Sequence, residues 1–199
     1  MLLLLSPAKT FDLEFKLDTD KSSKPQLIDH SEKLIKILKE YSPEQISKLM
    51  KVSEKIADLN FGRFKSWDPA GSHHALWAFA GDVYRGIEAQ DFTSAEVEFA
   101  QNHVGILSGL YGLLRPLDLM DPYRLEMGTR LSNPKGKNLY EFWDNEITNL
   151  IQKSNTDVVI NLASEEYAKS EKGLRYQLIE GKIMKDNDIK LDYAELVDY

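Results

Sequence analysis

Short apolar runs along the chain predict buried strands. Four leucines at 2–5 are followed at once by Ser6-Pro7, and residues 157–164 read DVVINLAS. Apolar runs of this length, bounded by turn or small polar residues, are typical of strands that are buried on both faces. The apolar and aromatic stretch 75–84, which contains Gly81 near its end, predicts another buried strand.

Apolar residues at helical spacing predict the helices. Leu27, Leu34, Ile37, Leu38 and Tyr41 recur on one face and indicate a helix within 27–41. Ser42 followed by Pro43 predicts a new helix, and Ser53 caps a further one, so that 43–65 form a helix, a tight turn and a helix.

A capping box and an amphipathic pattern predict two more helices. The TSAE sequence at 93–96 is a capping box, and the helix it opens is expected to turn four residues inward: Val97, Ala100, Val104 and Leu107. Residues 138–152 form an amphipathic pattern that predicts one helix, and EEY at 165–167 begins another turn or helix.

The remaining segments indicate how the chain is organised. Residues 11–25 predict an exposed connection, and the last 25 residues, around Gly181 and Asp186-Asn187, predict a hairpin. No repeat, low-complexity tract or linker divides the chain, and strands and helices do not alternate regularly. The sequence therefore predicts a single mixed α+β domain over residues 1–199, with short buried strands.

Composition narrows the possible chemistry. The 199 residues are 42% hydrophobic and carry a formal charge of −7, which disfavours general polyanion binding without a local basic face. The absence of cysteine excludes disulfides, thiolate metal sites and thiol peroxidases, and the four histidines show no metal-ligand spacing. We expect no metal and no cofactor. With no signal peptide and no membrane-spanning run, we expect a cytoplasmic protein that has no membrane partner.

The segment 107–131 is the most unusual part of the chain, because it mixes glycines, prolines and arginines with leucines. Pro116 and Pro122 disfavour helix at the residues before them, so Arg115, Tyr123 and Arg124 are expected on rigid loops. A guanidinium presented in this way suits a carboxylate or phosphate. The alternative is that these arginines form ion pairs within the segment, Arg115 with Asp118 and Arg124 with Glu126 or Asp121.

Small polar residues follow two of the predicted strands. Ser6, Lys9 and Thr10 come after the first strand, and Asn161, Ser164 and Tyr167 come at the end of the strand at 157–164. Strand ends often carry ligand contacts, so these residues could line one cleft. The alternative is a solvated lysine together with polar residues that cap the next helix. The glycines of a P-loop are missing.

The helical pair at 43–65 is the one nucleic-acid candidate in the sequence. It carries Lys48, Lys51, Lys55, Arg63 and Lys65 against three acidic residues, which gives a local charge of +2. Backbone N–H groups near Ser53, at the start of the second helix, can meet a phosphate. The alternative is an ordinary helical hairpin with one solvated face.

Several motifs together resemble the YaaA family of bacterial peroxide-stress proteins. LSPAKT at 5–10, LSGLYGLLRPLDLMDPYRLEMG at 107–128 and NLASEEY at 161–167 carry the resemblance, which covers about residues 1–170. It implies resistance to hydrogen peroxide through restraint of unincorporated iron. It also implies binding of double-stranded DNA by a helix-hairpin-helix element and a basic cleft, on a family-specific fold.

The resemblance assigns roles to particular residues of this chain. Lys48, Lys51 and Lys55, with the backbone near Ser53, would face phosphates. The cleft would be lined by Lys9, Arg115, Tyr123, Arg124, Glu126, Asn161, Ser164 and Tyr167. Family members usually continue into a basic Lys-Lys-Ala-Arg-Gly stretch, whereas residues 171–199 hold five Lys/Arg against seven Asp/Glu. This divergent or shortened C-terminal part predicts weaker DNA binding.

These observations support competing functions. The first is a non-catalytic stress protein that binds DNA. The second is an enzyme for a small anionic, nucleotide-like or amino-acid-like substrate, in which Lys9, Arg115 and Arg124 bind the anion while Glu126 or Tyr123 moves a proton. Direct iron binding would need carboxylates such as Glu126, Glu165 and Glu166, and is disfavoured.

Overall fold

The chain folds around a six-stranded sheet with strand order β10-β9-β8-β1-β5-β6. The computed structural model describes residues 1–154, 156, 158–170, 177–183 and 189–191. Strand β1 (Leu2–Leu5) lies between β5 (Val104–Ser108) and β8 (Val158–Asn161), parallel to both. Strand β9 (Gln177–Ile183) is parallel to β8, while β6 (Gly112–Leu114) and β10 (Ile189–Leu191) are antiparallel edge strands.

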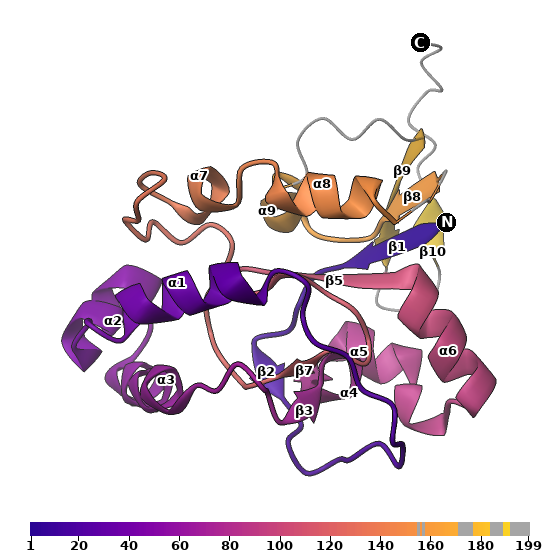
Figure 1. Cartoon of the computed structure of the whole chain (residues 1–199), viewed down its shortest axis with the longest axis horizontal. Helices are drawn as coiled ribbons and strands as arrows, with labels where there is room; N and C mark the ends of the chain where they lie inside the picture. The colour runs from indigo at the N-terminus through magenta and orange to yellow at the C-terminus, as the bar shows by residue number, and fades with distance from the viewer. Residues whose placement is uncertain (155, 157, 171–176, 184–188, 192–199) are drawn as a thin grey trace.

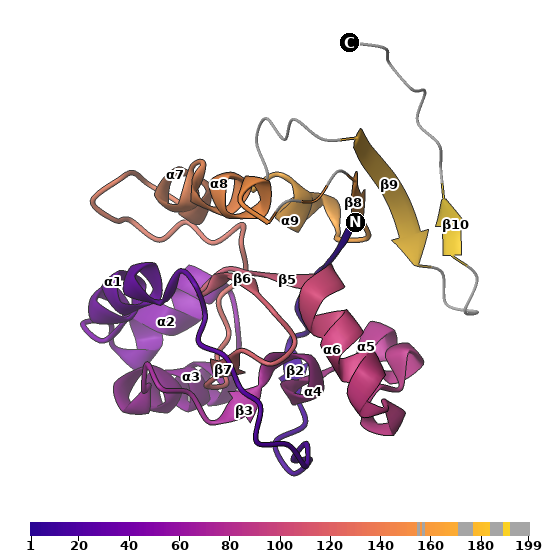
Figure 2. The same cartoon turned by 45° about the vertical axis from the view of Figure 1, so that its right-hand side comes forward.

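Helices cover both sides of this sheet, as Figures 1 and 2 show. Helices α7 (Leu139–Trp143), α8 (Glu146–Gln152) and α9 (Glu165–Ala168) lie above it in these views. Below it lie α4 (Ala75–Ala78), α5 (Asp82–Ile87), the 3-10 helix η1 (Ala89–Asp91) and α6 (Ser94–His103). Helices α1 (Ile28–Leu38), α2 (Pro43–Met50) and α3 (Glu54–Ser66) form a group at one end.

Two short strand pairs tie the loops below the sheet together. Strand β2 (Thr10–Phe11) pairs with β4 (Phe79–Ala80), and β3 (His73–His74) pairs with β7 (Leu119–Met120), both antiparallel. The mixture of a mostly parallel sheet, small antiparallel pairs and many short helices confirms the α+β fold class.

Two of the predicted helix starts are confirmed in atomic detail. The Ser42 side chain accepts a hydrogen bond from the Gln45 backbone N–H, and the Gln45 side-chain oxygen accepts one from the Ser42 backbone N–H. Thr93 and Glu96 form the same reciprocal capping box at the start of α6. The strands at 2–5 and within 157–164 are present, and β9 and β10 pair as a hairpin. Asp186 and Asn187 lie outside the described residues.

Three element predictions were wrong. The stretch 75–84 holds α4, β4 and the start of α5 in place of one strand, because a short helix buried on every side has the same apolar pattern as a strand. Helix α6 ends at His103, and Val104 is already extended in β5, so Val104 and Leu107 belong to a strand. The helix predicted over 138–152 is broken at Asp144, whose φ is 43°.

The segment 107–131 is largely a structural unit. It contains the β5–β6 hairpin and then runs back beneath it, where a Cβ on Gly109 would lie 2.1 Å from the Leu125 carbonyl oxygen. Gly112 has a φ of 73°, which other residues rarely adopt. The Tyr123 and Ser108 hydroxyls are 2.5 Å apart in the core, and Trp67 donates a 2.8 Å hydrogen bond to the Tyr111 hydroxyl. Close backbone approach therefore explains Gly109, and the positive φ explains Gly112.

Candidate functional site

Three adjoining cavities bring most of the predicted site residues together. A cleft of about 850 Å³, here called the hairpin cleft, lies between α2 and residues 126–130. A small junction cavity of about 50 Å³ shares Glu126 and Glu166 with it. A strand-end cavity of about 490 Å³ shares Pro7, Ala8 and Lys9 with the junction cavity. The cavities thus follow one another from α2 to the ends of β1 and β8.

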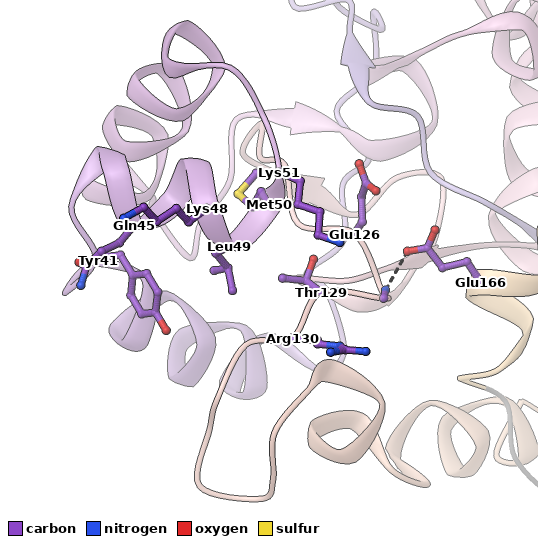
Figure 3. A pocket seen from close by; sticks show the side chains of 11 residues that line it. Tyr41, Gln45, Lys48, Leu49, Met50, Lys51, Glu126, Thr129, Arg130 and Glu166 are labelled. Carbon is purple, nitrogen blue, oxygen red and sulfur yellow. Dashed lines mark hydrogen bonds between the residues drawn. The ribbon is translucent and has the colours of Figure 1, made fainter.

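The hairpin cleft carries cations from both of its sides. Lys48 and Lys51 come from the end of α2, and Arg130 comes from the loop after Gly128. Lys51 points toward the wall that holds Glu126 and Thr129, as Figure 3 shows. Glu166 also lines the cleft, and its carboxylate accepts a 2.7 Å hydrogen bond from the Gly128 backbone N–H. The cleft therefore combines three cations with two carboxylates.

The turn between α2 and α3 is tight, although it contains no glycine. Lys51 adopts a left-handed conformation with φ 53°, and the Ser47 hydroxyl donates a 2.7 Å hydrogen bond to the Val52 carbonyl. Ser53 is the extended N-cap residue of α3, and its side chain makes no capping hydrogen bond. Lys55 is exposed in the first turn of α3 and does not line the hairpin cleft. Of the three predicted lysines, the structure brings Lys48 and Lys51 to this cleft.

The junction cavity is centred on one carboxylate that is shared by two cations. Lys9 Nζ and Arg124 Nη2 each lie 3.1 Å from the same oxygen, Glu126 Oε1. Arg124 Nε is buried and finds no hydrogen-bond partner among the described residues. Tyr123 and Tyr167 complete the lining with Glu166. The predicted pairing of Arg124 with Glu126 is confirmed, and Lys9 joins it.

The strand-end cavity lies where β1 and β8 end. Ser6 accepts a 2.9 Å hydrogen bond from the Ser164 backbone N–H, and the two serine hydroxyls are 3.3 Å apart. Tyr84 donates a 2.8 Å hydrogen bond to the Ser6 carbonyl, and the Thr10 hydroxyl donates to the Ala80 carbonyl. These contacts hold the two strand ends against the start of α5.

Burial controls the ionisation of the tyrosines at the site. Burial raises the pKa of Tyr123 well above its ordinary value, and the neighbouring Tyr167 adds to this effect. Burial also raises the pKa of Tyr167, with smaller contributions from Glu166 and Glu126. Both phenols are therefore neutral near pH 7. Because the Tyr123 hydroxyl is fully buried against Ser108, it is poorly placed to exchange a proton with a ligand.

Two predicted cleft residues have structural contacts elsewhere. Arg115 Nη2 lies 3.0 Å from Asp118 Oδ1 and 3.4 Å from the Lys24 carbonyl, and it lines none of the three cavities. The internal alternative for Arg115 is therefore the observed one. Burial raises the pKa of Asp118, although Arg115 and Ser23 oppose the shift. The buried Asn161 side chain accepts a hydrogen bond from the Ala163 N–H and closes the turn after β8.

Several lining residues were not predicted from the sequence. Thr129 and Arg130 lie near the end of the segment 107–131 but were assigned no role there, and Glu166 was considered only as an iron ligand. The start of α5, residues 81–84, lines the strand-end cavity. The sequence pattern assigned these residues to a buried strand and gave them no chemical role.

The described residues also bear on metals and membranes. Within the described ranges, no group of three or more histidine, aspartate or glutamate side chains is arranged to hold a metal ion. No helix in the described part of the chain has the length and apolarity that are needed to cross a membrane.

Comparison with known protein families gives one match. A family model described as peroxide stress protein YaaA matches residues 1–195. The match extends past residue 170, where the sequence motifs end, and includes β9 and β10.

Proposed function

The chain belongs to the peroxide stress protein YaaA family, and from this we propose that it acts in peroxide stress by binding double-stranded DNA through the α2–α3 hairpin. The observation that supports the proposal most directly is the placement of Lys48 and Lys51 on one wall of the hairpin cleft, beside a tight turn. Lysines grouped in this way contact phosphates without reading the bases, so binding is independent of sequence.

The start of α3 adds a second phosphate contact. This helix is 13 residues long, and the N–H groups of its first turn lie next to Ser53, whose own side chain does not cap them. N–H groups at a helix N-terminus favour a phosphate oxygen. Lys55, on the first turn of α3, would then contact the same strand from outside the cleft.

We further infer that DNA binding limits iron-driven damage without a catalytic step. DNA phosphates hold a layer of condensed cations, and a protein that neutralises phosphates releases those cations. Ferrous iron held in that layer would be released with them, so peroxide would meet less iron at the DNA. Residues that bind phosphates are sufficient for this effect, and no reaction is assigned to the chain.

A fluorescent duplex titrated with the protein across a salt series tests the proposal by polarisation. About three phosphate contacts predict a slope near −3 in log K against log salt, with weak binding at physiological salt. Replacing Lys48 and Lys51 together by Ala should remove most of the binding and reduce the slope by about 2.

Lys33 and Lys36 on α1 provide the matched control, because both are exposed and their replacement by Ala changes the net charge equally. Equal losses in the two double variants would show that only net charge matters, and the hairpin assignment would fail. An absence of binding even at low salt would refute DNA binding by this chain.

A further inference from the structure

The junction cavity has features of an oxyanion site that holds the protein's own carboxylate. Two cations, Lys9 and Arg124, converge on a single oxygen of Glu126. The Arg124 guanidinium normally binds an oxyanion through a fork of two N–H groups, yet its buried Nε is unpaired among the described residues. Buried hydrogen-bond donors are normally paired, so the Arg124 Nε–H group would be satisfied by a further acceptor. A ligand oxyanion with two or three oxygens would supply it.

The position in the fold also favours a ligand. Strand β1 lies between β5 and β8. After β1 the next strand of this sheet is β5, on one side of β1, whereas after β8 the next strand is β9, on the opposite side. In sheets of parallel strands, a crevice forms at the carboxyl ends where successive connections diverge in this way. The strand-end cavity lies there, with Ser6 and Ser164 at its wall.

The sizes of the cavities indicate how a ligand would be divided between them. The strand-end cavity, at about 490 Å³, is within the range of small-molecule sites, and small side chains such as Ala8 and Ala163 line it. The junction cavity, at about 50 Å³, has room for only a few waters, and the Glu126 carboxylate already occupies its two cations. An anionic group therefore enters only if the Glu126 carboxylate moves away. Glu126 also lines the hairpin cleft, toward which Lys51 points.

We propose that the chain binds a small organic oxyanion, a carboxylate or phosphate monoester with an apolar body, at the ends of β1 and β8. Its anionic group displaces the Glu126 carboxylate from Lys9 and Arg124, and its body fills the strand-end cavity. None of the hairpin lysines is a ligand in this site.

Calorimetric titration with phenyl phosphate, phenylacetate, inorganic phosphate and neutral benzyl alcohol tests the proposal. We expect saturable binding of phenyl phosphate or phenylacetate, and which of them binds identifies the anionic group. Glu126→Gln should tighten that binding about tenfold, because the competing charge is removed. Ala163→Leu should weaken the phenyl compounds but leave inorganic phosphate unchanged.

Lys9→Met should abolish anion binding, and Lys21→Met is its matched control. The two lysines are similarly exposed, and each is paired with one glutamate. Glu40→Gln, at an exposed carboxylate, is the control for Glu126→Gln. Circular dichroism establishes that each variant is folded. The proposal fails if neither phenyl anion binds wild type or Glu126→Gln at millimolar concentration. It fails equally if the control variants change affinity as much as the site variants. If Glu126→Gln does not fold, the titrations of wild type and Ala163→Leu test the proposal without it.

Discussion

Four buried tyrosines make the stability of this protein sensitive to alkaline pH. Burial is the main cause that raises the pKa of Tyr84, Tyr111, Tyr123 and Tyr167 above the ordinary value of about 10. A phenol whose pKa is higher in the folded state than in the unfolded state stabilises the fold fully below pH 10. That stability is lost as the pH rises from 10 toward the folded pKa, because only the unfolded chain ionises there.

The size of the effect follows from the number of these groups. Each phenol lowers the free energy of unfolding by about 1.4 kcal/mol per pH unit above pH 10. Four together give about 5.5 kcal/mol per pH unit. A total stability of about 5 to 15 kcal/mol would then be lost within about 1 to 3 pH units above pH 10.

Absorbance at 295 nm, which reports tyrosinate, and far-ultraviolet circular dichroism should be followed together as the pH is raised. We expect the four buried tyrosines to ionise in one steep step that coincides with unfolding. Gradual ionisation of all tyrosines near pH 10, with the helix signal intact, would show that the buried phenols reach solvent and would refute the reasoning.

Substitutions at four positions test other features. Lys51→Gly and Lys51→Ala remove the same charge, but only glycine adopts the left-handed conformation of residue 51 without strain. The glycine variant should therefore melt about 1 to 4 °C higher than the alanine variant. Equal melting temperatures would contradict this. Gly109→Ala should lower the free energy of unfolding in urea by about 3 kcal/mol because its Cβ meets the Leu125 carbonyl. Gly62→Ala, in open space within α3, should raise that free energy by about 0.5 to 1 kcal/mol. Arg115→Ala should destabilise by about 3 kcal/mol in the same assay, since it leaves the buried Asp118 without its cation; binding of the phenyl anions should not change.

Local signals in the sequence predicted the elements that local chemistry determines. The capping box at Thr93, the Ser42-Pro43 helix start and the apolar strand at 2–5 each depend on a few neighbouring residues, and each is observed. The break at Asp144 was not predictable in this way. The apolar pattern continues through it, with buried residues on both α7 and α8, so the periodicity carries no sign of the positive φ at Asp144.

The candidate site was predictable in part for the same reason. The expectation that polar residues at two strand ends line one cleft was correct for Ser6, Lys9 and Ser164, because strands β1 and β8 are neighbours. For Arg115 and Arg124 the sequence left two alternatives open, and only three-dimensional contacts separate them. Arg115 is held by the buried Asp118, whereas Arg124 shares Glu126 with Lys9, a residue more than 100 positions away in the chain.

The central place of β1 in the sheet has a consequence for how the chain folds during synthesis. Strand β1 is made before both of its partners, Val104–Ile106 on one side and Val159–Asn161 on the other. At about 5 to 20 residues per second, a ribosome needs roughly 8 to 30 s to reach the second partner. Until Val104–Ile106 is made, the four leucines of β1 have no strand to pair with, and their other side stays unpaired until Val159–Asn161 follows. Contacts between such distant residues also slow folding itself, so β1 is the segment that we expect a chaperone to protect on the nascent chain.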